Sequence, residues 1–188
     1  MTILSPLARP SPLSRLGALR TPALILGGSL LMAVCARTQI PFWPVPMTMQ
    51  VFGVFLLAAL AGGRQASAMI VLYLAEGALG LPVFANATGP AALLGPTGGY
   101  LIGFAVAALL AGEWMTRAGW RGTMASGFPM LAGLLVIYLC GAAWLARFVG
   151  WPNVLATGVL PFVIGDLLKI TLAATVATAL LRPFAKVQ

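Results

Sequence analysis

The sequence predicts an all-α integral membrane protein, a bundle of six transmembrane helices with both termini in the cytoplasm. Of its 188 residues, 61% are hydrophobic and only 7% are charged, which is more apolar surface than a water-soluble globule of this size can bury. One crossing of the hydrocarbon core, roughly 30 Å thick, needs about 20 mostly apolar residues, so the chain has room for about six crossings. Single basic residues between the apolar runs indicate which side of the membrane each loop lies on.

The chain divides into a tail and one membrane domain. Residues 1–21 are predicted to be a cytoplasmic tail, because their basic residues lie among Ser and Pro, and residues 22–188 are predicted to form a single six-helix domain. The six helices are expected at about residues 22–36, 47–63, 65–81, 98–114, 128–148 and 155–181. A signal peptide is the alternative for the first of these, because small residues, Ala33 and Cys35, stand near its end.

Glycine and proline separate these helices. Gly62 and Gly63 end the second, Pro82 ends the third, and Pro183 follows the sixth. The loop prolines are Pro41, Pro44 and Pro46 in the first long loop, and Pro90 and Pro96 in the second. Each proline lacks a backbone donor and biases the residue before it toward extended geometry, so neither loop is expected to be helical.

The positions of the basic residues test the topology. With six helices, the positive-inside rule places most of them on one side. That cytoplasmic set comprises the tail arginines (Arg9, Arg15 and Arg20), Arg64, Arg117, Arg121, Arg182 and Lys186. Only Arg37 and Arg147 fall on the other side, where the two long loops also lie. Non-helical backbone at the membrane is buried in protein or lines a cavity, so these loops predict the roof of an outward-facing pocket; simple connecting turns are the alternative.

Asp166 and Lys169 form the most informative pair in the sequence. They lie in an otherwise apolar run from residue 159 to 181, and their spacing of three puts them on one helix face. A charge in the membrane interior costs about 2.5 to 3.5 kcal/mol on insertion scales, and such residues usually face the bundle interior and mark a site. The alternative is an ion pair that only fixes helix packing.

Other polar residues in apolar runs have two interpretations each. Glu76 could face the same cavity or lie at a helix end, and Gln50 could bind a polar ligand or a neighbouring helix. Glu113 precedes Arg117 by four residues, which favours an ion pair at the membrane surface.

Small residues recur in the first helix. Ser29 and Ala33 are one turn apart, beside Gly27 and Gly28, and such faces let helices approach closely. This face could pack within the bundle or dock against another membrane subunit.

Several classes of function are excluded. The chain has no histidine, which removes the usual metal ligand and general base, so no catalytic or metal-binding residues are predicted. The only cysteines, Cys35 and Cys140, lie in apolar runs, so a disulfide framework is excluded. The isolated basic residues do not form a nucleic-acid-binding face. No GxxxxGK[ST] loop is present, so the chain is not expected to hydrolyse ATP itself.

Four motifs, in order, resemble the BioY family, the biotin-binding S components of energy-coupling factor (ECF) transporters. They are TQIPFWPVPMTMQ (38–50), YLAEGALGLPVFA (73–85), LGPTGGYLIGF (94–104) and GDLLK (165–169). The resemblance implies a multi-pass protein of the bacterial cytoplasmic membrane that takes up biotin. It implies a pocket near the outer face, and docking through Ser29 and Ala33 of the first helix to a membrane-embedded coupling subunit driven by two ATPase subunits. No covalently bound cofactor is implied, and self-association is left open.

The resemblance also implies roles for individual residues. Asp166 would accept hydrogen bonds from the ureido N–H groups of biotin, Lys169 would donate to the ligand, and Asn86 would contact its other end. Gln50 is a further polar candidate, and the biotin carboxylate would meet Tyr100, Thr97 or N–H groups of the outer loops. The aromatic candidates for walling the ring are Phe42, Trp43, Tyr73 and Phe84. An S component for riboflavin or thiamine, or a structural membrane protein, is the alternative.

Overall fold

The structure is a computed structural model that describes residues 21–86, 88–119 and 123–185. In chain order its elements are α1 (Thr21–Arg37), β1 (Gln39–Ile40), β2 (Met47–Thr48), α2 (Gln50–Ala61), α3 (Gly63–Ala78), α4 (Pro90–Leu94), α5 (Gly98–Ala118), α6 (Thr123–Val149), α7 (Trp151–Gly158) and α8 (Leu160–Ala185). The all-α fold class is therefore confirmed, whereas nearly all of the predicted tail lies outside the described residues.

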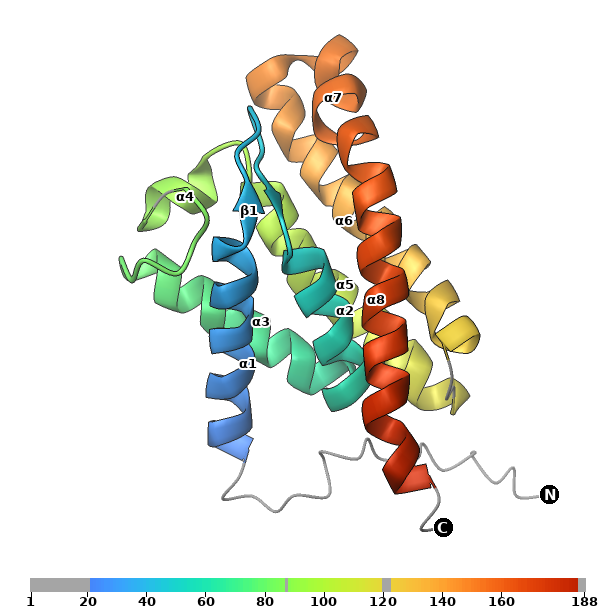
Figure 1. Ribbon diagram of the computed structural model, residues 1–188. Coiled ribbons are helices and arrows are strands. Elements are labelled where there is room, and N and C mark those ends of the chain that lie inside the picture. The colour runs from blue at the N-terminus through green and yellow to red at the C-terminus, as the bar shows by residue number, and fades with distance from the viewer. Residues whose placement is uncertain (1–20, 87, 120–122, 186–188) are drawn as a thin grey trace, which may run out of the picture.

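The helices form one bundle with distinct ends. The hairpin of β1 and β2, together with α4 and α7, lies toward the upper end in Figure 1, and α1 begins and α8 ends at the lower end. Helix α3 runs obliquely across the bundle. The predicted outer loops thus lie toward one end of the molecule, although the side of the membrane that this end faces stays a prediction.

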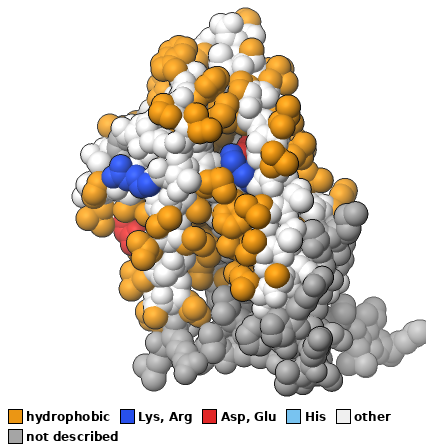
Figure 2. All heavy atoms as spheres, viewed as in Figure 1, with side chains coloured by type: hydrophobic (Ala, Val, Ile, Leu, Met, Phe, Trp, Pro, Cys, Tyr) orange, Lys and Arg blue, Asp and Glu red, His pale blue; other side chains and the backbone are white. Residues whose placement is uncertain are grey.

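The helix surfaces suit a lipid environment. Within the described residues, three helical stretches are long and apolar enough to cross a membrane, Gly98–Ala118, Ser126–Val149 and Trp151–Leu181. Large hydrophobic side chains are exposed on the outside, among them Leu30 (65%) and Ile164 (76%). Figure 2 shows such side chains spread over one face, with few charged groups among them. Because α1 and α2 are apolar but shorter, the count of six crossings stays a prediction.

Both long loops contain short regular elements that the sequence interpretation missed. The first carries a hairpin in which Gln39 pairs with Thr48 and Ile40 with Met47, in antiparallel register. The second helix therefore begins at Gln50, because Met47 belongs to a strand. The second loop contains α4, which begins at Pro90; proline suits a first helical turn because its fixed φ matches the helix and no donor is needed there.

The predicted sixth helix is two helices. Helix α7 ends at Gly158, and Val159 breaks the chain direction with φ −125° and ψ −64°. Pro161 cannot donate a hydrogen bond back into α7, but it is tolerated in the first turn of α8. The predicted start at residue 155 was wrong for this reason, and α8 continues past the predicted end at residue 181.

Three other observed helix boundaries differ from the predicted ones, and a glycine follows the helix at two of them. Helix α5 extends to Ala118, beyond the predicted residue 114, and is terminated by Gly119 in the left-handed conformation with φ 63°. Helix α3 ends at Ala78, before the predicted residue 81, and Gly80 follows with φ 95°. Helix α6 begins at Thr123, earlier than the predicted residue 128.

Helices α3 and α5 are in backbone contact at two glycines, and this contact supports a stability prediction. A β-carbon added at Gly112 would lie 2.5 Å from the Cα of Gly63. We expect Gly112→Ala to lower stability by about 1–3 kcal/mol, because a packed contact must open. The matched control is Gly27→Ala in α1, which would meet no atom within 4 Å. Thermal unfolding in detergent measures both, and equal melting temperatures would contradict the prediction.

Candidate functional site

A cavity lies among the helices below the β-hairpin. Its volume is about 90 Å³, several times the roughly 10–15 Å³ that one water molecule requires. Seven elements contribute side chains, namely β2, α2, α3, α4, α5, α6 and α8, and so do the turn between the two strands and the segment between α3 and α4. The apolar part of the wall includes Val45, Phe84, Leu101, Phe104, Ile137 and Phe162. The lining of the cavity is mainly hydrophobic with a few polar groups, as expected of a small-molecule site.

One polar group of the cavity is centred on Asp166 of α8. This residue is only 3% exposed. The Nζ of Lys169 donates to its Oδ1 at 2.7 Å, and the Tyr138 hydroxyl of α6 donates to its Oδ2 at 2.8 Å. Both carboxylate oxygens are therefore held by a partner, which offsets the cost of burying the charge. The spacing of three residues puts the two side chains on one helix face, as the sequence predicted, and there they form an ion pair.

This first group retains hydrogen-bonding capacity toward a ligand. Each carboxylate oxygen of Asp166 has two lone pairs, and one protein donor occupies only one of them. The ammonium of Lys169 has three donors, its side chain is 16% exposed, and it lines the cavity. The pair can therefore accept from N–H groups of a ligand and donate to its carbonyl or carboxylate oxygen.

A second polar group links three elements. The Thr48 hydroxyl of β2 donates to Oε1 of Gln50 in α2 at 3.0 Å, and Nε2 of Gln50 donates to the Tyr73 hydroxyl of α3 at 3.0 Å. All three residues line the cavity. Because the Tyr73 oxygen accepts from Gln50, its own O–H can donate toward a bound molecule.

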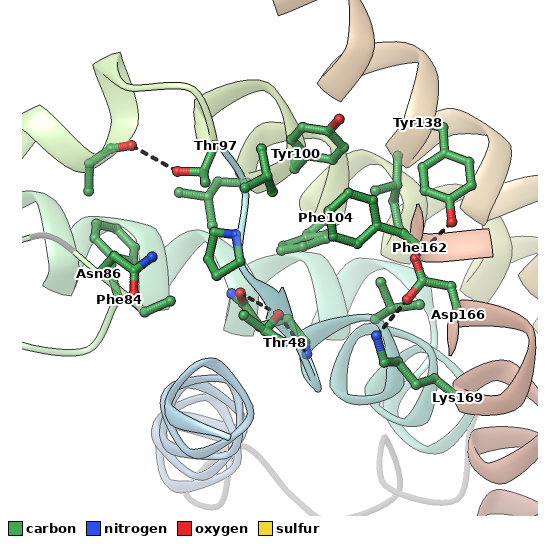
Figure 3. Close-up of a pocket in the computed structure, with 18 of the residues that line it drawn as sticks. Thr48, Phe84, Asn86, Thr97, Tyr100, Phe104, Tyr138, Phe162, Asp166 and Lys169 are labelled. Carbon is green, nitrogen blue, oxygen red and sulfur yellow. Dashed lines mark hydrogen bonds and ion pairs between the residues drawn. The ribbon is translucent and has the colours of Figure 1, made fainter. Parts of the chain in front are cut away.

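Figure 3 shows how the polar residues are distributed around the cavity. Asn86 and Thr97 lie on one side, and Asp166 and Lys169 on the other, with the ring of Phe104 between them. The distribution suits an elongated molecule with polar groups at both ends and an apolar middle.

The hairpin is tied to the segment that carries Asn86. The guanidinium of Arg37 donates to the carbonyl of Pro82 at 2.7 Å, and Nε2 of Gln39 donates to the carbonyl of Ala85 at 3.1 Å. These bonds join residues more than forty positions apart and hold the two predicted roof segments together.

The structure brings most of the sequence-predicted substrate residues together. Those that line the cavity are Asp166, Lys169, Asn86, Gln50, Thr97, Tyr100, Tyr73 and Phe84. Phe42 and Trp43 do not line it: the Phe42 ring packs edge-to-face with that of Phe162 at 5.8 Å between centroids, and Trp43 is 79% exposed. Both lie near the tip of the hairpin, beyond its paired residues. The ligand-binding roles of all these residues stay predictions.

Two predicted polar residues have partners that limit what they can do. The Tyr100 hydroxyl donates to the carbonyl of Gly158 at 2.7 Å, so in this conformation it can accept from a ligand but cannot donate to a carboxylate. Glu76 does not line the cavity; it accepts a hydrogen bond from the Ser29 hydroxyl, between α1 and α3.

Ser29, which the sequence predicted to contact a docking subunit, is buried in the structure. Ser29 is 1% exposed because its hydroxyl is turned toward Glu76, and its neighbour Gly28 packs against Met69 of α3. Ala33 is partly buried against the core. Gly28 and Ser29 therefore pack within the bundle, which was the alternative interpretation, whereas Gly27 has no atom within 4 Å of its Cβ position. Docking of another subunit through α1 stays a prediction.

Sequence reasoning missed Tyr138, Phe104 and Phe162. Tyr138 had a detectable signal, since a tyrosine in an apolar helix usually needs a partner for its hydroxyl. The two phenylalanines had none, because a phenylalanine in an apolar run can face lipid or protein equally well. Within the described residues, no group of three or more His, Cys, Asp or Glu could hold a metal ion.

Comparison with known proteins places the chain among transporters. It is 42% identical over 151 residues to the "Probable biotin transporter BioY" of Pyrococcus horikoshii, covering 80% of this chain and 89% of that protein. It is 42% identical over 155 residues to the "Biotin transporter BioY" of Thermotoga maritima, with the same coverage of each. The "Biotin transporter BioY2" of Lactococcus lactis is 35% identical over 162 residues, covering 85% and 88%.

The fold matches a solved structure as well. The crystal structure of the S-component for biotin from an ECF-type ABC transporter superposes with a TM-score of 0.78 at 23% identity, covering 87% of this chain and 92% of that one. The fold is therefore the S-component fold, and the apolar helices make this a multi-pass membrane protein. The family model of the BioY family matches residues 8–186. With nearly the whole sequence matched, this chain belongs to the BioY family.

Proposed function

We propose that this chain binds biotin and takes it up as the substrate-specific membrane subunit of an ECF-type transporter. The observation that carries the proposal is the cavity with the Asp166, Lys169 and Tyr138 group on one wall, in a chain whose relatives are named biotin transporters. The chemistry of biotin, a ureido group, a thioether ring, an apolar chain and a carboxylate, matches a cavity with polar ends and an apolar middle.

The ureido group binds at Asp166. Its N–H groups donate to the carboxylate, and its carbonyl accepts from Lys169, whose ammonium lies 2.7 Å from the carboxylate. Hydrogen bonds to charged groups contribute about 1.5–3 kcal/mol each, which makes this contact the main polar source of affinity. The rings of Phe104 and Phe162 pack against the apolar part of the ligand.

The carboxylate end binds on the side of Asn86 and Thr97. Among the described residues that line the cavity, Lys169 is the only basic one, and it is already engaged with Asp166. The donors on this side are the Asn86 amide and N–H groups of the segments near it. The Thr97 hydroxyl donates to the carbonyl of Ala92 at 3.4 Å and would have to turn away from it to donate to the carboxylate.

Energy for uptake comes from partner subunits. The chain lacks a phosphate-binding loop of the GxxxxGK[ST] type, so a membrane-embedded coupling subunit and two ATPase subunits supply the work. The chain crosses the bacterial cytoplasmic membrane six times, with both termini inside.

Ligand binding by the purified chain tests this proposal. The chain in mild detergent is titrated calorimetrically with biotin, riboflavin and thiamine, and mass spectrometry identifies any molecule that it retains. We expect one biotin per chain and no heat of binding from the other two vitamins. Preference for riboflavin or thiamine, or no binding by a chain with an intact melting transition, would overturn the proposal.

Tyr138 provides a further prediction. Tyr138→Phe removes the hydroxyl that donates to Oδ2 of Asp166 but keeps the ring, so the carboxylate loses one of its two positioning bonds. We expect biotin affinity to fall by about 5- to 10-fold, or about 1–1.4 kcal/mol. This is less than the roughly 1.5–3 kcal/mol of a hydrogen bond to a charged group, because Tyr138 positions the carboxylate and does not itself bind the ligand. Calorimetric titration measures this, and an unchanged affinity would show that Tyr138 does not position the carboxylate.

A further inference from the structure

A second cluster of charge lies toward the other end of the bundle from the β-hairpin, where α3 begins and α5 ends (Figure 1). Oε1 of Glu113 is 3.7 Å from Nε of Arg64, and its Oε2 is 3.5 Å from Nη2 of Arg117. The backbone contact between Gly63 and Gly112 sets Arg64 beside the last turns of α5. The fold thus places two guanidinium groups on either side of one carboxylate.

The arginines of this cluster remain available to an external anion. Their side chains are 84% and 69% exposed, and both distances exceed the roughly 2.7–2.9 Å of a charge-assisted hydrogen bond. Glu113 balances one of the two positive charges, so the cluster keeps a net positive charge. The planar fork of N–H donors on arginine matches the oxygens of a phosphate.

An apolar surface continues from this cluster along α5. The charged residues share a groove with Leu109, Leu110 and Trp114, and Trp114 packs edge-on against Phe128 at 5.5 Å between ring centroids. The exposed large side chains of α5 are Ile102, Val106, Leu109, Leu110 and Trp114. The rise from Ile102 to Trp114 is about 18 Å, close to half of the roughly 30 Å hydrocarbon core. A basic end and an apolar strip of this length fit an amphiphile.

We propose that this groove binds an anionic phospholipid, with its phosphate at Arg64 and Arg117 and an acyl chain along the exposed strip of α5. The positive-inside orientation puts this end in the cytoplasmic leaflet, where anionic lipids give the surface a negative potential that attracts basic residues. Trp114 lies beside the charges, where an aromatic ring suits the membrane interface. The site is separate from the biotin cavity and shares no residue with it.

Native mass spectrometry of the full chain with defined lipids tests the proposal. The probes are phosphatidylglycerol and phosphatidylcholine with identical acyl chains. We expect phosphatidylglycerol to be retained in preference, and Arg64→Gln with Arg117→Gln to lower its retention about tenfold or more, since each basic residue at the surface contributes. The matched control is Arg147→Gln, an exposed arginine outside the groove, which leaves retention unchanged.

A second variant tests the same site in the opposite direction and does not depend on the double variant being folded. Glu113→Gln removes the carboxylate between the arginines, so it should raise retention of phosphatidylglycerol. Equal retention of the two lipids overturns the proposal and favours a protein partner for this groove. The proposal is also overturned if Glu113→Gln does not raise the retention of phosphatidylglycerol. An equal loss of retention in Arg147→Gln and in the double arginine variant would likewise overturn it, because the lipid would then respond only to the net charge of the protein.

Discussion

Asp166→Asn will reduce biotin affinity at least 100-fold, because it removes the charged acceptor of the ureido N–H groups. Two hydrogen bonds to a charged group together contribute about 3–6 kcal/mol, which corresponds to two orders of magnitude or more. The asparagine amide has an NH₂ group in place of one carboxylate oxygen. This group either faces an N–H donor of the ligand or takes the place of the oxygen that accepts from Lys169 or Tyr138. Calorimetric titration of the purified variant measures the loss.

The control for this variant is the same acid-to-amide change outside the cavity. Glu113→Gln lies in the other charged cluster and should bind biotin as the unmodified chain does. The melting temperature of each variant in detergent confirms that it is folded. Full biotin binding by folded Asp166→Asn would remove Asp166 from the site and return the ion pair to a packing role.

Lys169→Met will destabilise the fold by about 3–5 kcal/mol, because breaking a buried pair leaves one charge without its partner. Asp166 is 3% exposed, and only the Tyr138 hydroxyl would remain bonded to it. Biotin binding should be lost as well, since the ammonium donor is gone. Reversible unfolding in mixed micelles measures the stability, and titration measures the binding.

The double variant Asp166→Asn with Lys169→Met separates the two effects. With neither charge present, most of the lost stability should return, whereas biotin binding should stay absent. Arg147→Met removes an exposed cation that stacks on the Trp144 ring at 3.7 Å, so it should cost only about 0.5–1 kcal/mol. If the double variant bound biotin, the pair would serve packing alone; if Lys169→Met were as stable as the unmodified chain, Asp166 would not depend on this partner.

Composition and short-range sequence patterns were enough to predict much of the secondary structure of this protein. Composition predicted the membrane class, and the spacing of three between Asp166 and Lys169 predicted that they share one helix face, where the structure places them in contact. Proline and glycine located most helix boundaries because their backbone restrictions act within a few residues. Errors arose where a distant or following segment intervened, as at Met47, which pairs with a strand, and at Val159, where Pro161 forces a break.

The sequence by itself determined the class of protein, the approximate helices, and a buried charged pair in a chain with the motifs of a biotin transporter. Only the tertiary structure decided that Tyr138 completes the charged group, that Gln50 joins Thr48 to Tyr73, and that Ser29 is buried. The physical reason is that lipid is as apolar as the interior of the bundle. In a water-soluble helix, polar residues mark the outer face, but here both faces are apolar, so periodicity cannot show which face meets another helix.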